Sequence, residues 1–262
     1  MSSLFRFNGT GNARTVPVWG CVCAACERAR RDSSYCRGAC SAVLETDTYR
    51  LLIDAGQPDL CQRYAPADIS AIMLTHYHMD HVMGLFHLRW GKNCEIPVHG
   101  PDDPQGCDDL FKHPGVLKFQ APLRPFEARR LGPFEVTALP LNHSKPTLGY
   151  LFHNWTDGSD GRRLAYLTDT LGLPADTKGF LMANQPDVMI LDCSHPPRPD
   201  PRNHNDLTIA LGLIDAIQPE QAFLTHIGHE LDEYLMNRPS LPANVRIAQD
   251  GQVLDLSAAS AS

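Results

Sequence analysis

The chain has 262 residues, enough for one α/β domain with a well-buried core, and its 43% hydrophobic and 20% charged residues are ordinary for a globular protein. The formal net charge of −7 argues against a nucleic-acid backbone as the main partner, because proteins that bind nucleic acids usually carry a basic surface. No stretch is long and apolar enough to span a membrane, and the N-terminus lacks a signal-peptide pattern. We therefore expect a cytoplasmic protein without a membrane partner.

Hydrophobic patterning predicts alternating strands and helices, without a low-complexity linker that would divide the chain. A strand-like segment at 4–7 precedes a long loop, and a polar helical stretch is expected at 27–31. Apolar runs at 41–45 and 49–53, with turn residues between them, predict a β-hairpin. Further short apolar runs predict strands at 70–75, 134–141, 148–152, 164–168, 187–191 and 222–225. Helices are expected at 80–90, where Asp80 would suit the first position, and at 205–217.

Polar side chains stand directly after several of the predicted strands. His76 and His226 both follow an apolar strand that ends in Leu-Thr, which fits a fold whose two similar halves deliver ligands to one edge. Asp54 and Asp169 also follow strands, although an aspartate in this place more commonly caps a turn. His143, in a loop, fits a surface position and a ligand position equally well.

The segment HYHMDH at 76–81 places three histidines and one aspartate within six residues. Imidazole nitrogens and carboxylate oxygens suit divalent zinc, manganese, iron or nickel. His76 and His78 point to the same side of an extended segment, whereas Asp80 and His81, at the turn into a helix, can point to a second position. The segment therefore predicts two adjacent metal ions, and a merely histidine-rich surface loop is the alternative.

Nine cysteines, an odd number, do not indicate a disulfide framework in a chain of this length. The close spacing of Cys21, Cys23 and Cys26 favours a metal site over three ordinary buried thiols or a redox motif. Structural zinc takes four ligands, and Cys36 and Cys40 are the nearby candidates for the fourth. The other cysteines are expected to be packing residues: Cys61, Cys94, Cys107 and Cys193.

The His-x-His-x-Asp-His segment after an apolar strand resembles the signature of the metallo-β-lactamase superfamily. Other segments, spread over almost the whole chain, resemble the PhnP family, the phosphodiesterases of the carbon–phosphorus lyase pathway of phosphonate use. These segments are CVCAAC at 21–26, THYHMDH at 75–81, GCDDLFKHPG at 106–115, LNHSK at 141–145 and DCSHPPR at 192–198. That family is related to the tRNA 3′-end processing endonucleases.

The resemblance implies a four-layer αββα sandwich over residues 1–262, with a zinc-binding loop near 21–40 and two divalent metals (manganese, zinc or nickel) at one edge. Matching motifs assign seven ligands: His76, His78 and His143 to one metal, Asp80, His81 and His226 to the other, and Asp169 as a bridge. Asp54 would orient the metal ligands without binding a metal itself. His229 would complete the structural zinc site with Cys21, Cys23 and Cys26, which would tie that loop to the catalytic edge.

Two adjacent metals suit phosphodiester hydrolysis, because they activate water and stabilise charge on a phosphoryl oxygen. The resemblance assigns His204 as the general acid and counts Asp80 among the catalytic residues; by itself, His204 is a polar residue at the start of a helix. His195 and His113 also match family positions, without an assigned role. Lys145, Arg198 and Arg202 are the candidates for holding a further substrate phosphate.

The function implied by the resemblance is hydrolysis of 5-phosphoribosyl 1,2-cyclic phosphate to ribose 1,5-bisphosphate, by a homodimer that also accepts 2′,3′-cyclic nucleotides. Three alternatives stay open. A tRNA 3′-processing endonuclease is disfavoured by the acidic charge and by the absence of a basic Gly- and Pro-rich insertion from the sequence. A thiolester hydrolase of the glyoxalase type matches less of the chain. A non-catalytic metal or ligand-binding member of the fold is disfavoured because the ligand set is complete.

Overall fold

The computed structural model describes residues 3–156, 159–237 and 240–257, which form two seven-stranded mixed sheets. The first sheet has the order β14 (Val253–Asp255), β1 (Leu4–Gly9), β2 (Ser41–Glu45), β3 (Arg50–Ile53), β4 (Ala71–Met73), β5 (Ile96–His99) and β6 (Leu117–Phe119). The second has the order β13 (Val245–Ile247), β12 (Gln221–Thr225), β11 (Val188–Asp192), β10 (Ser159–Leu167), β9 (Leu148–Thr156), β8 (Phe134–Pro140) and β7 (Ala128–Leu131).

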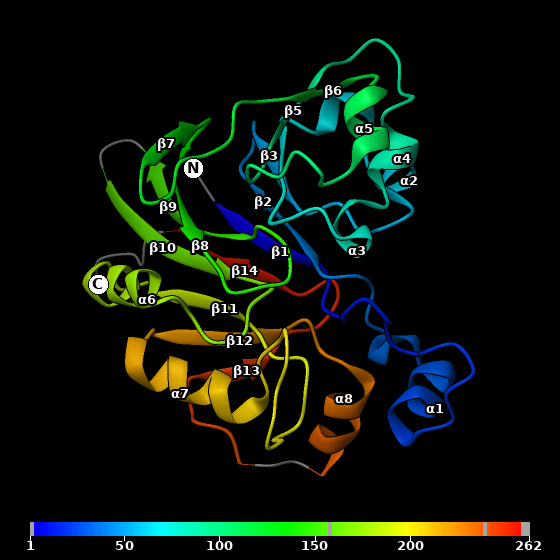
Figure 1. Cartoon of the computed structure of the whole chain (residues 1–262), viewed down its shortest axis with the longest axis vertical. Helices are drawn as coiled ribbons and strands as arrows, with labels where there is room; N and C mark the ends of the chain where they lie inside the picture. The colour runs from blue at the N-terminus through cyan, green and yellow to red at the C-terminus, as the bar shows by residue number, and fades with distance from the viewer. Residues whose placement is uncertain (1–2, 157–158, 238–239, 258–262) are drawn as a thin grey trace.

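Three buried apolar clusters show how the layers pack. One contains side chains from both sheets, including Phe5, Tyr150 and Phe223, and fills the space between them. A second lies under α6 (Ala175–Ala183), α7 (Leu207–Ile217) and α8 (His229–Met236), on the outer face of the second sheet. The third packs the outer face of the first sheet against α2 (Leu60–Arg63), α3 (Met79–Val82), α4 (Leu85–Leu88) and α5 (Asp108–Lys112). Helices therefore cover two stacked sheets, as Figure 1 shows, and the predicted αββα sandwich is confirmed.

The expected central elements are present, and most of their boundaries move by only a few residues. The hairpin is confirmed, since β2 and β3 pair antiparallel. The N-terminal strand extends to Gly9, and α1 (Ala24–Arg31) begins three residues earlier than expected. The helix expected at 205–217 is α7, and it begins at Leu207, because the carboxylate of Asp206 accepts a hydrogen bond from the Ile209 N–H and caps this helix.

The single helix expected at 80–90 is wrong. The chain instead forms α3 and α4, separated at Gly84, whose backbone N–H donates to the Ala55 carbonyl and not to a helical partner. A Cβ on Gly84 would lie 2.3 Å from the Gln57 carbonyl oxygen, so only glycine allows the two segments to approach this closely. Asp80 does not cap α3 either: the cap position is His78, and the Asp80 carboxylate faces the histidines described below.

Parallel pairing sets the position of the functional side chains. In the first sheet β3 and β4 are parallel, and in the second sheet β10, β11 and β12 are parallel. Their carboxyl ends therefore meet at one edge, where the chain continues into loops. Within the described part of the chain, no helix is long and apolar enough to cross a membrane.

Candidate metal centre

Three histidines form the first of two clusters at this edge. The Nδ1 atom of His78 lies 2.8 Å from Nε2 of His76 and 3.0 Å from Nε2 of His143. The Oδ2 atom of Asp169 lies 3.7 Å from the Nε2 atoms of His76 and His143. Four potential ligand atoms therefore converge on one small volume.

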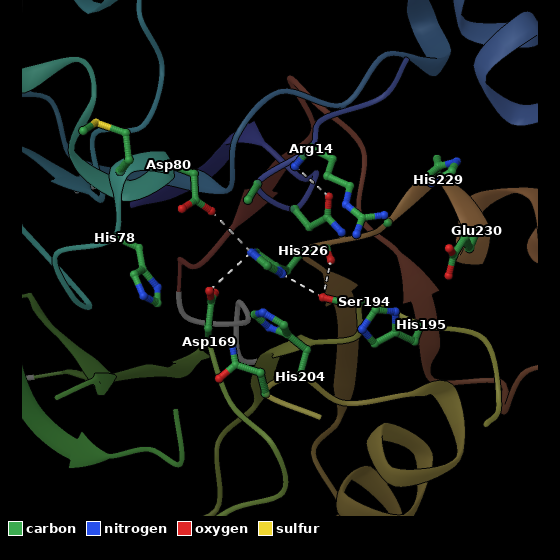
Figure 2. A pocket seen from close by; sticks show the side chains of 15 residues that line it. Arg14, His78, Asp80, Asp169, Ser194, His195, His204, His226, His229 and Glu230 are labelled. Carbon is green, nitrogen blue, oxygen red and sulfur yellow. Dashed lines mark hydrogen bonds and ion pairs between the residues drawn. The ribbon is translucent and has the colours of Figure 1, made fainter. Parts of the chain in front are cut away.

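The second cluster lies beside the first and shares the same aspartate oxygen. Oδ2 of Asp169 is 3.4 Å from Nε2 of His81 and 3.4 Å from Nε2 of His226. The Asp80 carboxylate completes the set, with Oδ2 at 3.4 Å from His81 Nε2 and 3.8 Å from His226 Nε2. Figure 2 shows His226 between Asp80 and Asp169. Asp169 thus stands between two ligand sets, where a bridging carboxylate would stand.

Hydrogen bonds on the far side of the rings fix which nitrogen carries the proton. In four histidines Nδ1 contacts an oxygen: Thr75 Oγ1 at 3.0 Å from His76, Asp54 Oδ2 at 2.8 Å from His81, Asn203 O at 3.2 Å from His143 and Ser194 Oγ at 2.8 Å from His226. A carbonyl or carboxylate oxygen can only accept a hydrogen bond. The hydroxyls of Thr75 and Ser194 donate to Asp54 and to the His226 carbonyl, so each can accept from the histidine Nδ1. Nδ1 therefore donates, which leaves the Nε2 lone pairs directed into the clusters.

This arrangement fits divalent cations. The buried Nε2 atoms of His81 and His226 have no hydrogen-bond partner among the described residues. Unsatisfied buried nitrogens are rare, and lone pairs facing carboxylate oxygens repel each other unless a cation lies between them. Imidazole and carboxylate together suit zinc, manganese or nickel, so the seven predicted residues offer two complete ligand sets.

The electrostatics favour the metal-binding protonation states of Asp169 and His76 but not that of His81. Burial works to raise the pKa of Asp169, but the His226 and His81 rings outweigh it and hold this pKa well below its usual range. Burial lowers the pKa of His76 well below its ordinary value, so this ring is neutral. His81 differs: burial is outweighed by Asp169 and Asp54, which raise its pKa. Metal binding at His81 therefore competes with protonation.

His204 lies over the second cluster. Its ring stacks on that of His226, with centroids 4.7 Å apart, and its Nδ1 lies 2.8 Å from Oδ2 of the buried Asp192. Burial lowers the pKa of His204, but the Asp192 carboxylate outweighs this effect and raises it to about 9. The same residue lines a pocket of about 440 Å³ together with both ends of the metal cluster, His78 and Asp169.

Of the other residues singled out from the sequence, only one lines this pocket. His195 lines it, whereas His113 ends α5 and does not. The three candidates for a substrate phosphate are outside its lining and already paired with carboxylates: Lys145 with Asp103 at 3.2 Å, Arg198 with Glu230 at 3.1 Å and Arg202 with Asp200 at 2.9 Å. The pocket wall instead contains Asn12 and Arg14, which the sequence analysis missed because the loop at 11–15 carries no motif.

The segment at 21–40, called here the cysteine loop, packs against α8. Ligand atoms of Cys21, Cys23, Cys26 and His229 all lie within 4.8 Å of one another, and His229 Nδ1 is 3.5 Å from Cys21 Sγ and 3.4 Å from Cys23 Sγ. Cys36 and Cys40, the alternatives near in sequence, are elsewhere: the Cys36 thiol contacts the Ala29 carbonyl, and the Cys40 thiol contacts the Tyr166 hydroxyl. Of the expected packing cysteines, Cys193 is buried, but Cys61 is exposed on the four-residue helix α2 and that expectation is wrong.

Comparison with known proteins identifies the class. Residues 49–227 match the family model of the beta-lactamase superfamily domain, and the chain belongs to this superfamily, with the metallo-β-lactamase fold. A crystal structure of a diphosphatase from the PhnP family is similar over 98% of this chain and 99% of that one, with a TM-score of 0.80 and 26% identity. The expected superfamily is thereby confirmed.

Two curated relatives are also similar to the chain. An octanoyltransferase of Porphyromonas gingivalis is 27% identical over 260 residues, which are 93% of this chain and 49% of that protein. A ribonuclease Z of Methanosarcina acetivorans is 27% identical over 153 residues, which are 53% of this chain and 49% of that protein. The chain spans about half the length of these relatives. Together with the ligand clusters, the comparisons support a metal-binding hydrolase of the superfamily.

Proposed function

We propose that this chain is a dinuclear metal-dependent phosphodiesterase for small substrates. Its substrate would be 5-phosphoribosyl 1,2-cyclic phosphate, hydrolysed to ribose 1,5-bisphosphate during phosphonate degradation. The observation that carries the proposal is the single Asp169 oxygen shared by two ligand sets, with His204 beside them in the same pocket. That combination offers two metal positions and a proton donor to one phosphoryl group.

In this proposal His76, His78 and His143 would hold one metal, Asp80, His81 and His226 would hold the other, and Asp169 would offer a ligand to both. Manganese, zinc or nickel bound there would act as Lewis acids on a phosphoryl oxygen and on the attacking water. Asp54 acts behind this set, because its carboxylate fixes the tautomer of His81. A third metal, held by Cys21, Cys23, Cys26 and His229 as structural zinc, would fix the cysteine loop against α8.

His204 is proposed as the general acid. Asp192 accepts the hydrogen bond from Nδ1, so Nε2 is the nitrogen available to a substrate in the pocket. Stacking on His226 holds the ring next to the proposed metal ligands. From this position His204 donates its Nε2 proton to the leaving alkoxide oxygen and is then reprotonated from solvent. Asp192 stabilises the protonated ring before the transfer.

Several observations favour a small substrate over tRNA. A pocket of about 440 Å³ is the size of a small-molecule site, and the net charge of −7 is unfavourable for a polyanion. The structure of the PhnP-family diphosphatase is more similar to this chain, with a TM-score of 0.80 and 26% identity, than that of human tRNase Z, short form, with 0.68 and 18%; both cover at least 97% of this chain. The relative named octanoyltransferase is about twice as long as this chain, which covers 49% of it. We therefore do not assign acyl transfer to this pocket. A homodimer and a cytoplasmic location complete the proposal.

The proposal is tested by offering manganese-loaded protein three substrates: bis(p-nitrophenyl) phosphate, a 2′,3′-cyclic nucleotide and a precursor tRNA. We expect turnover of the two small diesters and no specific cleavage of the tRNA. A His76→Ala variant, which lacks one proposed ligand, serves as the control for contaminating phosphodiesterase. Efficient tRNA cleavage would favour the endonuclease alternative, and inactivity on all three substrates with two metals bound would refute phosphodiester chemistry.

A further inference from the structure

Arg14 is an unpaired cation in the wall of the catalytic pocket. Its side chain is exposed, and no carboxylate or hydrogen-bond acceptor contacts its guanidinium among residues 3–156, 159–237 and 240–257. The nearby cations differ in this respect, since Arg198 already pairs with Glu230, the acidic residue at the pocket rim. A phosphate entering the pocket would therefore meet a free guanidinium at Arg14 and would not have to displace a protein carboxylate.

The loop that carries Arg14 is fixed relative to the metal ligands. The Gly11 N–H donates to the Gly38 carbonyl at 2.8 Å, and the Asn12 N–H donates to the Ile227 carbonyl at 3.3 Å. Ile227 directly follows His226. The Asn12 side chain then accepts a hydrogen bond from the Arg14 N–H at 3.0 Å, which sets the direction in which the arginine leaves the loop. The backbone at Arg14 thus has a defined place, while its side chain keeps its donors free.

Two other donors in the same pocket are unoccupied. The Oδ1 atom of Asn12 accepts from Arg14, whereas its Nδ2 makes no hydrogen bond within the described part of the chain. The ring of His195 makes none there either, and its centroid lies 6.4 Å from that of His204. Burial, aided by Arg198, lowers the pKa of His195, so the ring is a neutral donor. Figure 2 shows Arg14 and His195 on the side of His226 that faces away from His78.

We propose that Arg14, with Asn12 and His195, forms a subsite for a second phosphate group of the substrate, separate from the phosphodiester held at the metal clusters. The inference rests on the proposed phosphodiesterase function and deepens it, because it assigns residues to the phosphate monoester that the proposed cyclic phosphate substrate also carries. Arginine suits this role because its planar guanidinium presents paired N–H donors to phosphate oxygens. Arg14 is here a specificity-determining residue that takes no part in bond breaking.

Binding measurements test the subsite without relying on turnover. Adenosine 3′-monophosphate and adenosine 3′,5′-bisphosphate differ by one phosphate and are titrated calorimetrically into manganese-loaded protein. We expect the wild-type chain to bind the bisphosphate about tenfold more tightly, which is the size of a charge-assisted contact at an exposed site. Arg14→Ala should reduce this preference to about twofold or less, and Arg14→Lys should keep part of it. Arg63→Ala, which removes an exposed arginine of α2, should keep all of it.

A kinetic comparison separates this proposal from the proposed function. The substrates are 2′,3′-cyclic AMP with and without a 5′-phosphate, and Arg14→Ala should raise KM for the phosphorylated one with little change in its kcat. If neither is hydrolysed but the binding preference is present and depends on Arg14, the subsite stands and the phosphodiesterase function fails. The subsite is overturned if the wild-type chain shows no preference, if Arg14→Ala retains it, or if Arg202→Ala is the variant that loses it.

Discussion

The substitution Asp54→Asn isolates the proposed control of His81 by its neighbour. Asp54 is buried, and its Oδ2 accepts from His81 Nδ1 at 2.8 Å while its Oδ1 accepts from the Thr75 N–H at 2.8 Å. Asparagine has almost the same shape and tolerates the left-handed backbone found here, where φ is 60°. Its amide, however, has only one oxygen for these two donors, so either orientation places an NH₂ group against a donor.

The consequence for metal binding follows from the proton on His81. If the amide oxygen faces Thr75, the NH₂ group faces His81 Nδ1, and the ring proton moves to Nε2, where it blocks the ligand atom. The lost charge-assisted hydrogen bond contributes about 1.5–3 kcal/mol. This range agrees with the roughly 10–100-fold loss of metal affinity, about 1.4–2.8 kcal/mol, that follows removal of the hydrogen-bond partner of a metal ligand. We expect the loss at one of the two metals only.

The assay is a titration of metal-free protein with zinc in competition with a chromophoric chelator, fitted to two sites. Asp206→Asn is the matched control, because Asp206 is also buried and accepts two backbone hydrogen bonds, from Ile209 and Arg198. Its amide likewise has one oxygen for two donors, but neither donor belongs to a proposed metal ligand, so this control should bind both metals normally. Unchanged affinity at both sites of Asp54→Asn would refute the argument that Asp54 selects the tautomer of His81.

Two other predictions concern the proposed general acid, His204, and an ion-paired carboxylate of the first sheet, Glu45. His204→Ala should keep both metals and lose roughly 10²–10⁴-fold in turnover of alkyl-leaving diesters, with a much smaller loss on p-nitrophenyl esters; equal losses would contradict the acid role. Burial works to raise the pKa of Glu45, but Arg50 and Arg6 outweigh it and lower this pKa. The carboxylate therefore stabilises the fold above its unfolded pKa, about 4.3, and this contribution is lost as the pH falls. Glu45→Gln should cost less than about 1 kcal/mol at pH 7 in urea unfolding and still less near pH 3; an equal cost at both would contradict the ion pairs.

The positions that the sequence predicted best are those at the ends of buried strands. His76 and His226 follow apolar runs that form β4 and β12, and parallel pairing within each sheet aligns the ends of these strands with the ends of their neighbours. Asp54 and Asp169 are placed by the same rule, after β3 and β10. Their contacts with the histidines are not local: Asp169 contacts both His226 of its own sheet and His76 of the other sheet, so the stacking of the two sheets brings these side chains together.

The features that sequence reasoning missed depend on contacts between distant segments. Strand β7 reads ARRL, with three exposed residues, and it is a strand because it pairs with β8. At Gly84 the backbone N–H donates to the Ala55 carbonyl in place of a helical partner, which no periodicity at 80–90 reveals. Arg14 reaches the pocket because its loop is hydrogen-bonded beside Ile227, far along the chain. Short edge strands, close backbone approaches and loop anchoring are all set by the fold as a whole, so local patterns do not encode them.

The cysteine loop, residues 21–40, gives a last prediction, because contacts other than the proposed zinc site also hold it against α8. His229 brings its Nδ1 to the thiols, and Arg28 and Arg37 both pair with Asp232 one turn further along α8, at 3.2 and 3.1 Å. His229→Ala should therefore lose the structural zinc and lower Tm while the chain stays folded and keeps its other two metals.

Metal content measured by mass spectrometry and thermal unfolding check this prediction, and Cys36→Ser, which alters a nearby thiol outside the cluster, should retain the zinc. Limited proteolysis should cut His229→Ala between residues 17 and 23 faster than the wild-type chain, since Asp232 and Glu233 of α8 hold α1 through Arg28 and the Ala24 N–H but do not hold the segment before it. Tightly bound zinc in His229→Ala would place the fourth ligand elsewhere. Loss of all three metals would show that the cysteine loop and the catalytic edge fold as one unit.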